Sequence, residues 1–133
     1  MTELLRLRLP ATAVFVSVAR EAVVSLARGL GFASDDRDAL RLAVGEACNN
    51  AVEHGGPKAI LTLSCSQDAS FLIVEVANNG GAFVPEGSAS MPDADAEHGR
   101  GRALMQTLMD SVEYEETGRQ TLVRLKKRLP RWH

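Results

Sequence analysis

Residues 40–56 have the sequence LRLAVGEACNNAVEHGG, and this stretch does most to decide the fold. Its larger apolar residues recur at helical spacing, which predicts an amphipathic helix. The apolar stripe consists of Leu40, Val44, Ala47 and Ala51. A polar stripe lies beside it, and at about 100° per residue its members fall within roughly 140° of arc. The polar stripe consists of Glu46, Asn49, Asn50, Glu53 and His54.

The polar stripe differs from an ordinary solvated helix face, because it contains no Lys or Arg. Asn49 and Asn50 lower the helix propensity, since their amides compete with the backbone for hydrogen bonds. Glu46 and Asn50 are four residues apart, so their side chains meet. An Asn oxygen, together with water and phosphate oxygens, suits Mg²⁺, and a neighbouring carboxylate can take a proton. The stripe indicates a site; the alternative is a polar face that only caps nearby loops.

The size and charge of the chain narrow the class of protein. We expect 133 residues to form one domain with a substantial core, and a net charge of −2 gives no electrostatic reason to bind nucleic acid or an anionic membrane. Two cysteines do not make a disulfide framework, and no apolar run approaches the roughly 20 residues that span a bilayer. Arg6 and Arg8 before an apolar stretch weakly imitate a signal peptide, but Glu3 and polar interruptions argue against one. We therefore expect a cytoplasmic protein.

The rest of the chain predicts a small α+β fold. Alternating apolar and polar residues indicate strands, and Thr12 is a plausible N-cap for the first helix. The stretch from 79 to 100 is rich in small and polar residues and predicts a long loop. The order of elements implies a mixed or antiparallel sheet with helices on one face. The expected elements are a strand (4–9), two helices (12–30 and 34–56), a hairpin (59–66 and 70–77), a loop (79–100), a helix (103–112) and two strands (112–116 and 121–127).

Two glycine-containing segments flank the expected loop, and both suit a nucleotide. Asn78-Asn79-Gly80-Gly81 follows a strand, where an Asn amide can bond an adenine edge and glycine allows close backbone approach. Gly99-Arg100-Gly101 begins a helix, whose free N–H groups and positive dipole end favour phosphate. Arg100 and Arg102 add charged donors. Taken singly, the two segments could equally be a strand-end turn and a flexible joint.

In this order, the three segments resemble those of the GHKL ATPase superfamily, which includes gyrase and the histidine kinases. The chain is more closely similar to the bacterial anti-sigma-factor serine/threonine kinases. Residues 46–55 (EACNNAVEHG) resemble the family's N box, residues 78–83 (NNGGAF) its D-x-G-x-G-F box, and residues 99–110 (GRGRALMQTLMD) its G-x-G box and following helix. The resemblance covers nearly the whole chain. It implies a single histidine kinase-like ATPase domain over 1–133 with the Bergerat-type fold, an α+β two-layer sandwich with a mixed sheet and helices on one face.

The resemblance also implies a role for individual residues. Glu46 would be the general base towards a Ser or Thr hydroxyl of a protein substrate, and Asn50 would hold Mg²⁺ bridging the ATP phosphates. Asn78 would read the adenine amino group, and residues 80–98 would form a lid over the nucleotide. The residues implied in binding ATP are Asn49, Asn50, Asn78, Gly80, Gly99, Arg100 and Gly101.

The implied function is that of an ATP- and Mg²⁺-dependent kinase that phosphorylates a small anti-sigma-factor antagonist and sequesters a sigma factor. In that family homodimers are usual, and residues 16–26 of the first helix could form such an interface or belong to the core. Three departures from the family pattern, Asn78, Ala82 and Arg102, favour an alternative. In this alternative the same fold binds nucleotide weakly or not at all and acts by capturing partners.

Two further interpretations have less support. A detached ATP-binding domain of a histidine kinase would be expected beside a helical hairpin with a phosphoacceptor His, which the sequence does not show. A zinc site built from His54, Cys48, Cys65 and His98 lacks ligand spacing. His54 instead suits the negative end of the helix dipole.

Overall fold

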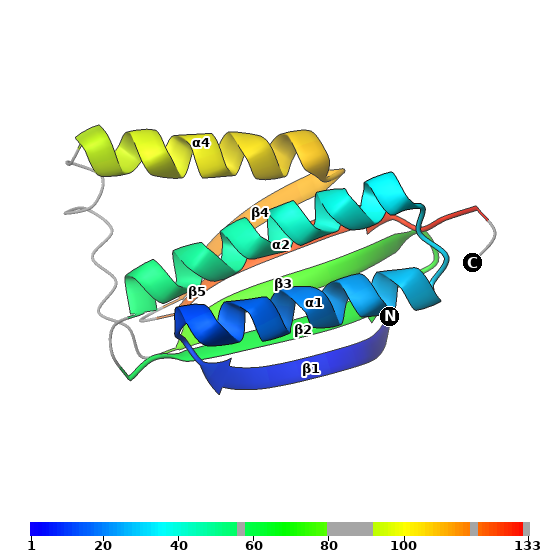
Figure 1. Cartoon of the computed structure of the whole chain (residues 1–133), viewed down its shortest axis with the longest axis horizontal. Helices are drawn as coiled ribbons and strands as arrows, with labels where there is room; N and C mark the ends of the chain where they lie inside the picture. The colour runs from blue at the N-terminus through cyan, green and yellow to red at the C-terminus, as the bar shows by residue number, and fades with distance from the viewer. Residues whose placement is uncertain (56–57, 80–91, 118–119, 132–133) are drawn as a thin grey trace.

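The structure, a computed structural model, describes residues 1–55, 58–79, 92–117 and 120–131. Within these ranges, three helices cover one face of a five-stranded sheet, with α2 packed between α1 and α4 (Figure 1). None of the helices in the described ranges is long and apolar enough to cross a membrane. The elements in chain order are β1 (Thr2–Pro10), α1 (Ala13–Gly29), α2 (Ser34–Gly55), β2 (Ile60–Gln67), β3 (Phe71–Asn79), α4 (Pro92–Leu108), β4 (Ser111–Thr117) and β5 (Gln120–Arg128).

The strand order is β1-β2-β3-β5-β4, and every neighbouring pair is antiparallel. The α+β architecture with helices on one face is therefore confirmed, and the sheet is antiparallel rather than mixed. The reason lies in the connections. Between β1 and β2 the chain makes two helical passes, out and back, so β2 returns against β1. The single helix α4 leads from β3 to β4, which run the same way, but β5 lies between them and pairs with both.

The core forms where alternating apolar residues of the central strands meet α1 and α2. Leu63 of β2 lies opposite Val76 of β3, which lies opposite Val123 of β5, and all three are buried. The apolar stripe predicted for α2 is in this core, since Leu40, Val44, Ala47 and Ala51 are all buried. On α1 the stretch 16–26 also contributes to the core, through Val16, Ala19, Val23 and Val24, and the exposed valines of this helix are Val14 and Val18.

Helix α4 begins at Pro92, eleven residues before the start expected from the sequence. Residues 92–100 therefore belong to a helix and not to the loop expected over 79–100, while residues 80–91 lie outside the described part. Proline at a first helical position and acidic residues close behind it are typical of a helix start. Apolar periodicity, on which the expectation rested, is absent from these turns, because the sequence there is small and polar.

The connections between these elements include one helix cap and two turns. Thr12 is the N-cap of α1, with φ −130° and ψ 158°, but its side chain makes no capping hydrogen bond. After α1 the chain turns at Gly31, whose φ of 91° favours glycine. In the hairpin between β2 and β3, the Asp68 carboxylate accepts hydrogen bonds from the backbone N–H of Ser70 (2.8 Å) and Phe71 (2.7 Å). These two donors lower the pKa of Asp68.

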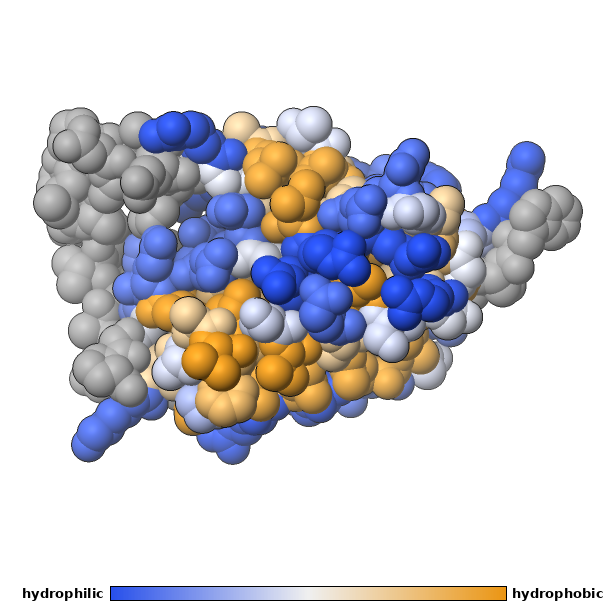
Figure 2. Space-filling model, in the orientation of Figure 1, coloured by the Kyte–Doolittle hydropathy of each residue, from blue (hydrophilic) through white to orange (hydrophobic). Residues whose placement is uncertain are grey.

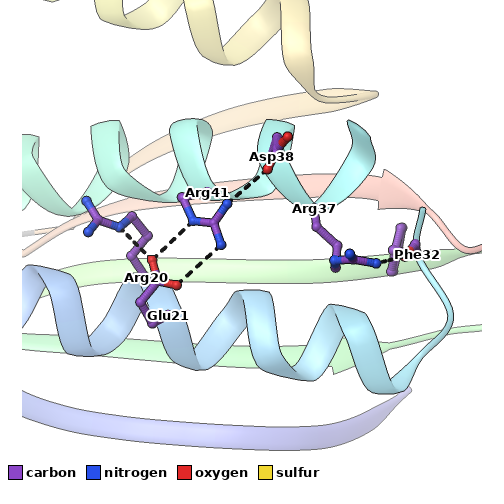
Figure 3. Close-up of polar contacts among 6 residues, drawn as sticks. All are labelled: Arg20, Glu21, Phe32, Arg37, Asp38 and Arg41. Atoms are coloured by element: carbon purple, nitrogen blue, oxygen red, sulfur yellow. Dashed lines mark hydrogen bonds and ion pairs between the residues drawn. The ribbon is translucent and has the colours of Figure 1, made fainter. Parts of the chain in front are cut away.

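Ion pairs join α1 and α2 on the solvent side of their contact (Figure 3). Arg41 of α2 donates from Nε to the Glu21 carboxylate of α1 at 3.2 Å and also pairs with Asp38 at 2.9 Å. Arg20 donates to the same Glu21 carboxylate at 3.1 Å. The hydrogen bond from Arg41, and then that from Arg20, lowers the pKa of Glu21. Exposed pairs of this kind add little stability, so the helices are held mainly by their buried residues.

Two leucines of α2 allow a matched test of its inward face. Leu40 is fully buried, whereas Leu42 is 53% exposed on the same helix. Leu40→Ala should lower the free energy of unfolding by about 2–5 kcal/mol, because it leaves a cavity in the core. Leu42→Ala should change it by less than about 0.5 kcal/mol. Urea unfolding of both variants measures the difference, and equal losses would contradict the orientation of α2.

Candidate functional site

The structure brings the polar stripe of α2 against the beginning of the glycine-containing part of α4. A cavity of about 530 Å³ separates the two helices. Residues roughly 50 to 60 positions apart in the sequence thus line one space. Figure 2 shows the polar band that follows α2 on this face. The cavity is lined by Glu46, Asn49, Asn50, Val52, Glu53, Arg100, Gly101 and Leu104.

The tightest point of this site lies between Glu46 and Gly101. A Cβ placed on Gly101 would lie 2.7 Å from the Glu46 Oε2 atom, closer than real Cβ atoms approach a neighbour. Gly101 is buried, so the carboxylate of α2 lies directly against the backbone of α4. Only glycine at position 101 lets α4 lie this close while Glu46 keeps its place.

A second, smaller cavity of about 60 Å³ lies between α2 and the strands β3, β5 and β4. Asn50 lines both cavities, so they adjoin at this residue. Much of the lining of the small cavity is apolar, as suits the face of a flat ring. The lining residues are Ala47, Asn50, Ala51, His54, Val76, Arg102, Tyr114, Glu115, Thr121, Leu122 and Val123.

Arg102 and Tyr114 form a pair at the wall of the small cavity. The Arg102 guanidinium lies over the Tyr114 ring, 4.6 Å from its centroid, which is a cation–π geometry. The Tyr114 hydroxyl is buried and has no hydrogen-bond partner within the described residues. Burial raises the pKa of Tyr114, and the charge of Arg102 opposes this shift. The arginine that departs from the family pattern thus has a defined place beside the site.

Asn78, expected to read the base, is fully buried at the end of β3. Its Nδ2 atom donates to the backbone carbonyl of Ala51 in α2 at 3.1 Å. Its Oδ1 atom accepts from the backbone N–H of Thr121 in β5 at 3.4 Å. The amide therefore makes its contacts inside the protein.

The other expected site residues are placed as follows. Gly99 lies near the middle of α4 and the exposed Arg100 lines the large cavity, while Gly80 lies outside the described residues. Of the expected lid, residues 92–98 are helical and residues 80–91 lie outside the described part.

Sequence reasoning missed the contribution of the last hairpin to the site. Tyr114, Thr121 and Val123 line the small cavity, yet none of them was expected at the site from the sequence. Alternation along β4 and β5 gives the signal that could have found them, since every second residue points towards the helices.

The family model for the histidine kinase-like ATPase domain matches residues 9–127 of this chain. The chain belongs to this family. The serine-protein kinases RsbW of Bacillus pumilus and Halalkalibacterium halodurans are 32% and 33% identical to it. These alignments cover 85% and 86% of this chain, and 78% and 76% of the two relatives. The resemblance found in the three sequence segments is thereby confirmed.

Solved structures show the same fold for this histidine kinase-like ATPase domain. The RsbU and RsbW domains of Rv1364c from Mycobacterium tuberculosis match with a TM-score of 0.71 at 18% identity, covering 94% of this chain and 31% of that one. The catalytic domain of histidine kinase ThkA matches with a TM-score of 0.57 at 10% identity, covering 95% of this chain and 98% of that one.

The two cysteines of the domain are buried between α2 and the sheet, away from solvent. Burial raises the pKa of both thiols to about 12, and the neighbouring Cys48 adds to the shift of Cys65. Over the described ranges, no cluster of His, Cys, Asp and Glu could hold a metal ion.

Thiol labelling tests this placement. At pH 8 both thiols should resist a maleimide or disulfide reagent in the folded protein, because neither is accessible or ionised. Both should react within the dead time once urea unfolds the chain. Labelling of either thiol at the rate of a free cysteine in the native protein would contradict the burial.

Proposed function

We propose that this chain is an ATP- and Mg²⁺-dependent protein serine/threonine kinase of the anti-sigma-factor type. One observation carries the proposal: Glu46 and Asn50 line the large cavity together with the G-x-G segment of α4. The family and the RsbW relatives support it. The cavity volume falls within the roughly 300–1,000 Å³ of small-molecule sites, and amides, carboxylates and an arginine line it.

The proposed site fits a magnesium nucleotide through its donor set. Amide oxygens and water are hard ligands that Mg²⁺ accepts, and Asn50 would supply one such oxygen. When bound, Mg²⁺ would neutralise charge on the phosphate oxygens. Asn49 would support the nucleotide, and Arg100 with the backbone of Gly99 and Gly101 would contact the phosphates. The base would enter the smaller cavity, which would have to widen around the Arg102–Tyr114 pair.

Glu46 would act on the protein substrate. As the substrate hydroxyl oxygen bonds to the γ-phosphorus and the bond to the ADP oxygen breaks, the Glu46 carboxylate takes the hydroxyl proton. ADP and a phosphoserine or phosphothreonine result. The contact with Gly101 would hold the carboxylate at the cavity wall, so that it meets the hydroxyl in a fixed place.

The proposed partners are inferred from the resemblance to the anti-sigma-factor kinases. The phosphoacceptor would be a small anti-sigma-factor antagonist, and the chain would sequester a sigma factor in the cytoplasm. A homodimer would bury the exposed Val14 and Val18 of α1, which are 73% and 48% exposed. The full chain, 1–133, would act as one ATPase-type domain.

A second candidate function is capture of partners without nucleotide. It is favoured by the small volume between α2 and the sheet and by the internal contacts of Asn78. Calorimetry with ATP, in the presence and absence of Mg²⁺, separates the two candidates. Mg²⁺-dependent binding, followed by phosphate transfer to the cognate antagonist, is expected for the kinase. Absence of transfer with the correct antagonist present would rule the kinase out.

Glu46→Gln tests the proposed proton acceptor. The variant keeps the size of the side chain but cannot take a proton, so transfer of ³²P to the antagonist should fall by at least about 100-fold. Binding of ATP, measured by calorimetry, and capture of the sigma factor should stay close to wild type. Full transfer by the variant would contradict the role of Glu46.

Gly101→Ala tests the fixed position of the Glu46 carboxylate. Alanine raises helix propensity by up to about 1 kcal/mol, and its Cβ meets only the movable end of Glu46, so stability should not fall. Displacement of the carboxylate should nevertheless lower phosphate transfer by about 100-fold.

The matched control is Gly29→Ala at the end of α1, where a Cβ meets nothing within 4 Å. This variant should retain full transfer. Thermal unfolding of both variants reports their stability beside the transfer assay. Normal transfer by Gly101→Ala would show that the Glu46–Gly101 contact does not set the reaction geometry.

A further inference from the structure

The side chain of Asn78 connects three elements at the end of the site. It belongs to β3, donates to the Ala51 carbonyl in α2 and accepts from the Thr121 N–H in β5. The C-terminal end of α2 packs closely against Asn78 and Ala59. A Cβ placed on Gly55 would lie 3.9 Å from the Asn78 Cβ and 2.6 Å from the Ala59 Cβ. The helix end therefore packs closely where the amide reaches its carbonyl.

The orientation of this amide is fixed by its two contacts. If the amide flipped, Nδ2 would face the Thr121 N–H, donor against donor, and Oδ1 would face the Ala51 carbonyl, acceptor against acceptor. Both polar groups would then be buried without partners, which is unfavourable. The amide therefore cannot turn to suit one base or another without breaking both contacts.

We propose that Asn78 is a positioning residue, which fastens the last turns of α2 to β3 and β5, and that it does not read the nucleotide base. The fastening follows from the contacts alone, and the second part rests on the proposed nucleotide site. Asn50, the residue next to Ala51, lines both cavities. The position of the last turns of α2 therefore determines where the side-chain oxygen of Asn50 lies.

The proposal explains why an amide stands at this position. An ionised carboxylate offers only acceptors, so it could accept from the Thr121 N–H but would repel the Ala51 carbonyl. It would also be a charge in a fully buried place. Asn supplies one donor and one acceptor in the required order.

Asn78→Asp tests the fastening through stability and its dependence on pH. At pH 7.5 the variant should raise the unfolding equilibrium constant by about 10- to 100-fold. The pKa of the new carboxyl would be raised in the folded state, because only its protonated form can donate to Ala51. The stability deficit should therefore be largest above that pKa and shrink as the pH falls to 5.

Two further variants serve as controls for the stability measurement. Asn49→Asp makes the same chemical change at an exposed position of α2 and should show no such deficit at either pH. Wild type, measured at both pH values, corrects for the titratable and charged groups of the adjoining cavity, which are His54, Arg102, Tyr114 and Glu115. Asn78→Ser is neutral and too short for both contacts, so it should lose stability without the pH dependence.

Calorimetry with ATP and GTP tests the second part of the proposal. A loosened helix end should weaken both nucleotides by the same factor in Asn78→Asp and Asn78→Ser, and the ratio of their affinities should equal that of wild type. Stronger binding of ATP alone in Asn78→Asp would identify residue 78 as a base reader and overturn the proposal.

The stability arm has its own decisive outcome. Equal stabilities of Asn78→Asp and Asn49→Asp at pH 7.5 would overturn the fastening. If wild type binds neither nucleotide, the proposed function fails, while the pH-dependent stability of Asn78→Asp still decides the fastening.

Discussion

The packing of α2 between the sheet, α1 and α4 is the constraint on which the rest of the structure depends. A helix surrounded on three sides needs small residues where its neighbours approach. Gly45 of α2 lies beside the Arg20 side chain of α1, and Gly101 of α4 lies against Glu46. A Cβ on Gly45 would make ordinary van der Waals contact with Arg20, whereas a Cβ on Gly101 would displace the Glu46 carboxylate at the wall of the cavity.

The two stripes of α2 have different places in the structure: the apolar stripe lies in the core, and the polar stripe lines the cavities. The apolar stripe removes Leu40 and Val44 from water and packs against the sheet, which supplies the free energy that holds the helix. That burial offsets the low helix propensity of the Asn49–Asn50 pair, which contributes nothing to the core. In a helix with little buried surface, the same pair of asparagines would cost more stability, because the formation of that helix would depend more on the propensities of its residues.

The central helix and its two stripes could be predicted from the sequence, because apolar and polar side chains recur there with the 3.6-residue period of a helix. It did not predict the start of α4, since residues 92–100 are small and polar on all sides and carry no periodic signal. It also could not place Asn78, because the amide's partners are backbone atoms of Ala51 and Thr121, which no side-chain pattern marks. The contact between Glu46 and Gly101 likewise depends on how two distant helices pack.

Two departures from the family pattern, Asn78 and Arg102, lie at one end of the site, and the third, Ala82, lies outside the described residues. Asn78 and Arg102 lie around the small cavity by the sheet, whereas Glu46, Asn50 and Gly101 keep the family's residue types in the large cavity. Each departure in the small cavity region has a partner within the protein: Asn78 bonds to α2 and β5, and Arg102 stacks on Tyr114. Arg102 and Tyr114 contact each other through their side chains, whereas Asn78 contacts backbone groups, which would lose their partner if residue 78 changed. Glu46 and Gly101 constrain each other, because any side chain at position 101 would meet the Glu46 carboxylate. The two ends of the site are therefore constrained in different ways, by the hydrogen bonds of Asn78 to backbone groups at one end and by the close approach of α2 and α4 at the other.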